Sequence, residues 1–154
     1  MKKLAVVMLV AVLALALTGC GSSSKSSGAS GSAAQKVEQA FDTDVALVKY
    51  RDKMEPSQGN VMVSFSLENK TDSTVVVGAE NIVVNGEYAV EVLGGSAAPI
   101  GPGQTGSVAE TFGYAVQTPL QSVDDIKSLS CDLVMHDNDS MSNVVGSVPV
   151  SVEL

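Results

Sequence analysis

The chain has 154 residues, and its 17 Asp and Glu outnumber its 9 Lys and Arg to give a formal charge of −8 at pH 7. Nucleic acid and anionic headgroups are bound through clustered basic side chains, so this acidic balance disfavours both as partners. The length suits one domain with a core of its own and is short for two.

The first twenty residues have the organisation of an export signal. Lys2 and Lys3 form a positive amino-terminal region, and an unbroken apolar run extends from Leu4 to Leu17. As a helix this run would reach only about 21 Å, less than a hydrocarbon core of about 30 Å. The pattern therefore favours a signal peptide over a permanent transmembrane helix.

The residues Leu17-Thr18-Gly19-Cys20 resemble the lipobox of bacterial lipoproteins. The resemblance implies cleavage before Cys20, attachment of lipid to its sulfur, and anchoring on the extracytoplasmic face of the cell membrane. The alternative is an ordinary secretory signal that happens to be followed by a cysteine. If Cys20 is lipidated, Cys131 has no partner, so we expect no disulfide within the chain.

This interpretation divides the chain into a signal peptide at residues 1–19, a lipidated cysteine with a tether at 20–41, and one folded domain at 42–154. Residues 21–34 are Ser, Gly and Ala apart from Lys25, a composition typical of a flexible, disordered linker. Residues 35–41 are compatible with a helical turn or two.

From residue 42 onward the hydrophobic pattern alternates with the period of a β-strand. The clearest strand is predicted at residues 60–69, where Val61, Val63, Phe65 and Leu67 share one face. A strand with one apolar and one polar face is typical of an antiparallel sheet that covers a core on one side.

Six further strands are predicted at residues 74–77, 81–84, 87–92, 105–116, 128–136 and 144–154. Asn85-Gly86 indicates a type I′ hairpin turn, and the Gly- and Pro-rich residues 94–104 indicate a loop. Ser122 and Asp125 have the capping-box spacing of a short helical turn. Pro149 lacks an N–H, so the last strand is expected at a sheet edge. The predicted fold class is all-β, an antiparallel β-sandwich of about seven to eight strands.

Three turn motifs follow one another in this domain: residues 65–72 (FSLENKTD), 83–86 (VVNG) and 101–104 (GPGQ). Their order resembles the small immunoglobulin-like domains of exported bacterial lipoproteins, many of which belong to a telokin-like group of unknown function. The resemblance covers roughly residues 43–154 and implies an immunoglobulin-like sandwich. It implies no catalytic residues.

Asp137 and Asp139 are the candidate metal ligands, because carboxylates close together in a turn suit Ca²⁺. The alternative is a solvated β-turn, since the glycine and glutamate of an EF-hand loop are missing. His136 is the only histidine and falls out of phase with the apolar face. Cys131 lies on that face and is expected to be a buried, unreactive thiol. Without a nucleophile–base pair, we expect no enzymatic activity and no cofactor.

The sequence thus favours a lipid-anchored, extracytoplasmic, non-catalytic sandwich that binds an unidentified surface or envelope protein. Contact is expected through loops or an exposed sheet edge, with residues 144–154 as the candidate edge. The alternative function is an envelope module that binds a small ligand or Ca²⁺.

Overall fold

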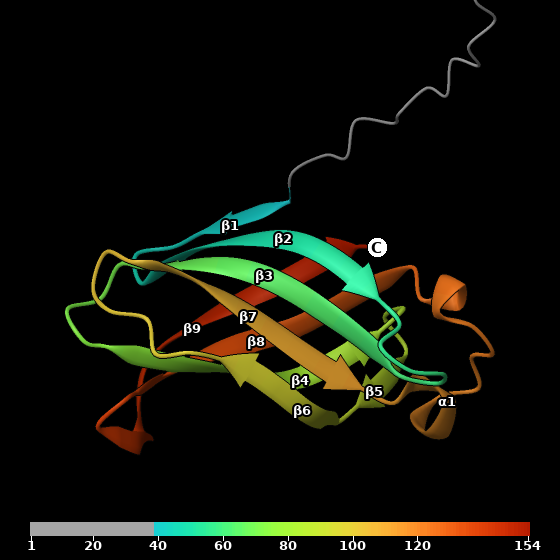
Figure 1. Cartoon of the computed structure of the whole chain (residues 1–154). Coiled ribbons are helices and arrows are strands. Elements are labelled where there is room, and N and C mark those ends of the chain that lie inside the picture. The colour runs from blue at the N-terminus through green and yellow to red at the C-terminus, as the bar shows by residue number, and fades with distance from the viewer. Residues whose placement is uncertain (1–38) are drawn as a thin grey trace, which may run out of the picture. The chain divides into compact units, whose positions relative to one another are not determined.

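A computed structural model describes residues 39–154 of the chain (Figure 1). The predicted signal peptide, Cys20 and nearly all of the predicted tether lie outside the described residues. Among the residues described, no helix is long and apolar enough to cross a membrane.

The domain is an antiparallel, immunoglobulin-like β-sandwich, as the sequence predicts. The five-stranded sheet has the order β1 (Ala40–Asp42), β2 (Ala46–Met54), β3 (Val61–Asn69), β7 (Thr105–Phe112) and β6 (Val92–Ala97). The four-stranded sheet has the order β5 (Tyr88–Val90), β4 (Val75–Val84), β8 (Ser128–Asp137) and β9 (Ser140–Glu153).

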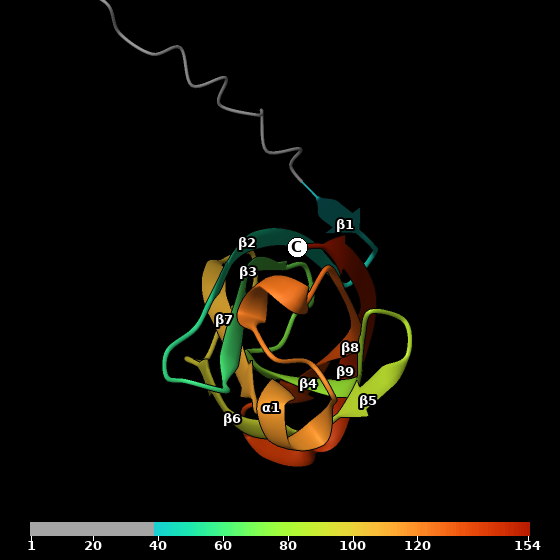
Figure 2. The ribbon, with the colours of Figure 1, turned by 90° about the vertical axis from the view of Figure 1, so that its right-hand side faces the viewer.

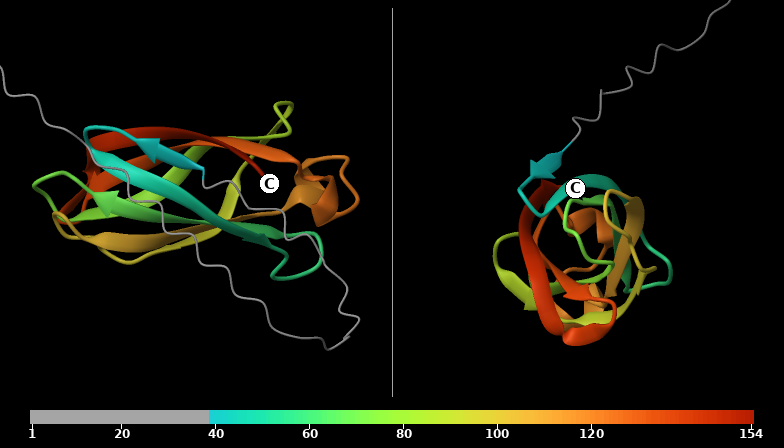
Figure 3. Two further views of the ribbon diagram at one scale, coloured as in Figure 1. Left: turned by 90° about the horizontal axis from the view of Figure 1, so that it is seen from above. Right: turned by 90° about the vertical axis from the view of Figure 1, so that its left-hand side faces the viewer.

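Two short helices lie at one end of the sandwich (Figure 2). They are α1 (Tyr114–Gln117) and the 3-10 helix η1 (Val123–Asp125). The predicted capping box is confirmed, because the Ser122 side chain accepts from Asp124 N–H and the Asp125 side chain accepts from Ser122 N–H. The turn between β8 and β9 lies at the opposite end (Figure 3).

The core forms where the inward faces of the two sheets meet, and strand alternation decides which side chains enter it. Val61, Val63, Phe65 and Leu67 of β3 are each at most 1% exposed. From β8, Leu129, Cys131, Leu133 and Met135 are likewise buried. Each fully buried aliphatic or aromatic side chain of this size stabilises the fold by about 1.5–3 kcal/mol.

One long strand, β4, replaces the two strands predicted at residues 74–77 and 81–84. The chain continues through the intervening residues because its register against β8 shifts at a bulge between Glu80 and Val83. Asn81 takes a left-handed backbone conformation there, with φ 53°. The hairpin turn predicted at Asn85-Gly86 follows β4 and is confirmed, since both residues have positive φ.

The strand predicted at residues 87–92 is wrong in extent, because the chain changes sheets at Glu91. Residues before it pair with β4 as β5, and residues after it pair with β7 as β6. The Gln117 side chain satisfies the backbone at this crossing: Glu91 N–H donates to its Oε1 (2.6 Å), and its Nε2 donates to Glu91 O (3.1 Å). Gly94 and Gly95, predicted to lie in a loop, belong to the edge strand β6.

Two further expectations about the strands need correction. Ala40 and Phe41 lie in the short edge strand β1 instead of a helical turn, because residues 40–42 pair with residues 47–49 of β2. The strand predicted to reach residue 116 ends at Phe112, where Gly113 leads into α1.

A buried asparagine joins two loops at the end of β3. The Asn69 side chain is 0% exposed; its Nδ2 donates to Ser73 O (2.8 Å) and Ile100 O (2.9 Å). Its Oδ1 accepts from the Thr71 backbone N–H (2.9 Å) and hydroxyl (2.7 Å). A buried amide that makes all four of its hydrogen bonds gives these loops one defined arrangement.

Asn69→Ala should therefore destabilise the domain by about 3 kcal/mol, because it removes all four hydrogen bonds of a buried amide and leaves the space of its side chain empty. Urea unfolding followed by circular dichroism measures the change. Asn138→Ala is the matched control, since the exposed Asn138 side chain reaches only Asp139 (3.4 Å). Equal losses in the two variants would contradict the role given to Asn69.

Candidate functional site

The candidate site is the outer face of the four-stranded sheet. We use "outer face" for the side chains of β4, β8 and β9 that point away from the core. Ser147, Pro149, Ser151 and Glu153 of β9 are exposed, and Ser130 and Asp132 of β8 are half-buried. The centre of this face is therefore open to solvent and carries small side chains.

Charge is distributed unequally over the two sheets. The strands of the four-stranded sheet contain no Lys or Arg, but they carry Glu80, Asp132, Asp137 and Glu153. The basic residues in the described part of the chain lie on β2 or in loops: Lys49, Arg51, Lys53, Lys70 and Lys127. The outer face is thus acidic without a compensating cation on its own strands.

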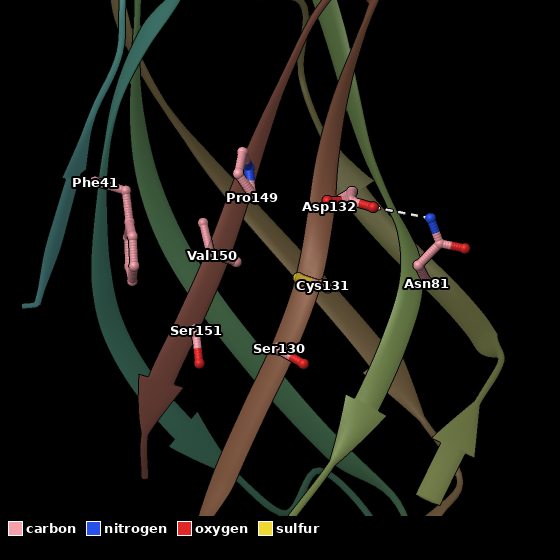
Figure 4. A pocket seen from close by; sticks show the side chains of 8 residues that line it. All are labelled: Phe41, Asn81, Ser130, Cys131, Asp132, Pro149, Val150 and Ser151. Atoms are coloured by element: carbon pink, nitrogen blue, oxygen red, sulfur yellow. Dashed lines mark hydrogen bonds between the residues drawn. The ribbon is translucent and has the colours of Figure 1, made fainter. Parts of the chain in front are cut away.

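A hollow of about 390 Å³ lies in the outer face (Figure 4). Its lining residues come from β1, β4, β8 and β9: Phe41, Asn81, Ser130, Cys131, Asp132, Pro149, Val150 and Ser151. Across it, Asn81 Nδ2 donates to Asp132 Oδ2 over 2.8 Å. The hollow therefore combines one carboxylate, two hydroxyls and an apolar proline surface.

The bulge in β4 creates this arrangement. It inserts Asn81 between Glu80, which lies opposite Asp132, and Val83, which lies opposite Ser130. Asparagine tolerates a left-handed conformation better than most residues, so it can occupy the bulge and hold Asp132. Glu80 and Asp132 remain directly opposite each other, and like charges in that position destabilise a sheet.

The acidic surface continues around the bulge to the next edge. A second hollow of about 280 Å³ shares Asn81 with the first, is also lined by Glu80, and extends to Glu91 at the crossing between the sheets. By contrast, the hollow on the five-stranded sheet, of about 230 Å³, is lined by Lys49 and Arg51 as well as Glu68. The two sheets therefore present faces of different charge.

Sequence reasoning missed a buried carboxyl group, Glu110 on β7. It points inward and is 5% exposed, and a Cβ on its neighbour Gly95 would lie 2.3 Å from its Oε2. Burial raises the pKa of Glu110 to about 7, and the Ala79 backbone amide offsets part of that rise. The signal was present, because Glu110 is in phase with the buried Val108 and Phe112.

The thiol of Cys131 is buried, as predicted. Burial raises its pKa to about 12, and the nearby charges of Asp132 and Glu110 add to the rise. A thiol with so high a pKa holds almost no nucleophilic thiolate at neutral pH.

Asp137 and Asp139, the predicted metal ligands, lie at the turn between β8 and β9. The Asp139 backbone N–H donates to Asp137 Oδ1 (2.9 Å), which is the hydrogen bond of an Asx turn. No group of three or more His, Cys, Asp or Glu side chains suited to a metal occurs in residues 39–154. Calcium binding by this pair stays a prediction. His136 is half-buried, and its Nδ1 has no hydrogen-bond partner among residues 39–154.

The last strand, β9, is an edge strand, as the proline in it predicts. Val148, Val150 and Val152 point into the core, but Val144 is 54% exposed because register shifts near His136 move it out of phase. The Gln39 side chain covers the carboxyl end of the edge: its Nε2 donates to Glu153 O (2.7 Å), and its Oε1 accepts from Glu153 N–H (2.8 Å).

No protein-family model and no curated protein matches the chain. One similar solved structure is a crystal structure of the yeast GGA1 GAE domain, with 10% sequence identity and a TM-score of 0.40. The match covers 76% of this chain and 97% of that chain. The assignment of the fold rests on the two sheets described above.

Glu110→Gln should change how stability depends on pH. A folded-state pKa of about 7 lies above the ordinary value of 4.5, so between these values the folded chain holds a proton that the unfolded chain has lost. The stability that this proton contributes is complete below about pH 4.5 and declines as the pH rises to about 7. The full interval corresponds to on the order of 3 kcal/mol.

Urea unfolding between pH 4.5 and 8 tests this expectation on the purified full-length chain in neutral detergent. Wild type should lose stability relative to Glu110→Gln as the pH rises, whereas Glu68→Gln, on the outside of β3, should follow wild type. Parallel pH profiles for wild type and Glu110→Gln would contradict the raised pKa.

Glu80→Gln should stabilise the domain by about 0.2–1 kcal/mol, because it removes the like charge opposite Asp132. Added salt screens the repulsion in wild type, so the gain should shrink as ionic strength increases. Thermal unfolding at low and high salt measures both effects. Asp72→Asn, in the exposed turn after β3, is the control and should change little; a loss of stability in Glu80→Gln would refute the repulsion.

Proposed function

We propose that the chain is a lipid-anchored, non-catalytic module on the extracytoplasmic face of the membrane, where it binds another surface or envelope protein. The lipobox-like residues ending at Cys20 support the location. The composition of residues 21–34 supports a tether that lets the domain search for its partner near the membrane.

The outer face of the four-stranded sheet is the observation that carries the binding role. It is open, hollowed at the centre and lined by small polar side chains that a partner can approach closely. Its uncompensated charge also suits selective recognition, because complementary potentials steer encounter and exclude wrong partners. The buried thiol of Cys131 favours binding over nucleophilic catalysis.

A small-ligand module is the second candidate function. The 390 Å³ hollow lies within the range of about 300–1,000 Å³ that is usual for small-molecule sites. Such sites are mostly apolar and enclose most of their ligand, whereas this hollow lies in a sheet surface among serine, asparagine and aspartate side chains. A protein partner is the better match to this lining.

Photo-crosslinking in cells tests the proposal on the full-length chain. A photoreactive phenylalanine analogue at position 151, in the hollow, should give a discrete adduct with one protein. The same analogue at position 107 is the matched control, because Ser107 is exposed on the outside of β7 in the other sheet. Equal labelling from both positions, or none from position 151, would contradict binding through the outer face.

Cys20→Ser tests the anchor in the same cells. Wild type should incorporate labelled palmitate and sediment with membranes, and the variant should do neither, with less adduct from position 151. Acyl labelling of the variant at the wild-type level would contradict lipidation at Cys20.

A further inference from the structure

We propose that the partner presents a basic segment to the outer face and that one of its Lys or Arg side chains enters the hollow beside Asp132. This inference rests on the proposed function and specifies the chemistry of the partner.

The lining of the hollow matches a long cationic side chain. Asp132 Oδ2 is held by Asn81, and among the described residues no donor is bound to its other carboxylate oxygen. Ser130 and Ser151 lie directly opposite each other on β8 and β9 and supply hydroxyl acceptors. Pro149 offers an apolar surface for the methylene stem, as long cationic side chains require.

Asp132 in the hollow and Glu80 beside it have no cationic partner in the described part of the chain. Glu80 lies opposite Asp132, and no ion pair within residues 39–154 involves either carboxylate. A cation from outside would replace their repulsion with attraction. A neutral or acidic partner would leave the repulsion in place, so the charge pattern selects a basic one.

The cations of the described residues are positioned away from the outer face. Lys53 Nζ donates to Val123 O (3.2 Å) and Ile126 O (2.8 Å), and Lys70 pairs with Asp42. Lys127 Nζ donates to Asp124 O (2.5 Å). Lys49 and Arg51 line the hollow on the five-stranded sheet. These five residues are all the Lys and Arg of residues 39–154, and none of them is on the outer face, so the described part of the chain supplies no cation to the hollow.

A defined probe tests the inference. An exposed ion pair contributes about 1 kcal/mol or less, so the probe should carry several charges. We choose the peptide acetyl-Lys-Ser-Lys-Ser-Lys-amide, whose lysines fall on one side of an extended chain. Its control has all three lysines Nε-acetylated, which removes the charge and keeps the backbone. Each is titrated into the full-length ¹⁵N-labelled chain in neutral detergent at low salt, and amide shifts are followed by NMR.

The lysine peptide should give saturable shifts at residues 130–132 and 149–151, and the acetylated peptide should not. Asp132→Asn should weaken binding roughly two- to fivefold, in line with the loss of one exposed ion pair. Glu68→Gln, in the hollow of the other sheet, should leave the affinity unchanged. The Asn81 hydrogen bond can persist in Asp132→Asn, and a thermal melt confirms that this variant is folded.

Shifts that fall elsewhere, that also appear with the acetylated peptide, or that titrate with unchanged affinity in Asp132→Asn would overturn the inference. The two proposals fail separately. An adduct from position 151 without peptide binding would overturn the basic partner and leave the interaction module standing. Peptide binding at Asp132 without any adduct in cells would overturn the proposed function and leave the chemistry of the hollow standing.

Discussion

Where the chain leaves a sheet, backbone N–H and C=O groups lose their hydrogen-bond partners on the neighbouring strand and need new ones. In this sandwich, amide side chains supply those hydrogen bonds. Asn69 joins the loops at one end of β4. At the other end, Asn85 Nδ2 donates to Asp125 O and its Oδ1 accepts from Lys127 N–H. Gln39 and Gln117 each bind both backbone groups of one residue, Glu153 and Glu91. Without these contacts, backbone N–H and C=O groups at the ends of the strands would lack hydrogen-bond partners.

This constraint also positions the candidate site. With both ends of β4 fixed by asparagine contacts, the extra residue in that strand is accommodated between them, at the bulge. The bulge turns Asn81 toward Asp132 and leaves Glu80 opposite the same carboxylate. A local irregularity in one strand thus determines both the shape and the charge of the outer face.

The sequence predicts the parts of this fold that depend on local pattern. Alternation identified the buried side chains of β3 and β8, and Asn85-Gly86 identified the hairpin turn. The split of residues 87–92 between two sheets escaped prediction because it depends on Gln117, 26 residues away from Glu91. The hollow escaped for the same reason, since its lining comes from four strands. The alternating pattern could have identified Glu110, because it is in phase with Val108 and Phe112, but a carboxylate in such a position is readily taken for an exposed residue.

The acidic composition takes on a different meaning once the strands are placed. As a total, a charge of −8 indicates little more than solubility. In the fold, the cations of β2 lie on one sheet, while the strands of the other sheet carry four carboxylates and no cation. Solubility alone does not require that separation, and the opposed pair of Glu80 and Asp132 weakens the sheet that carries it. A cationic surface bound to the outer face would offset the repulsion between Glu80 and Asp132 and gain attraction from both carboxylates. This is a physical reason for the two faces to differ in charge.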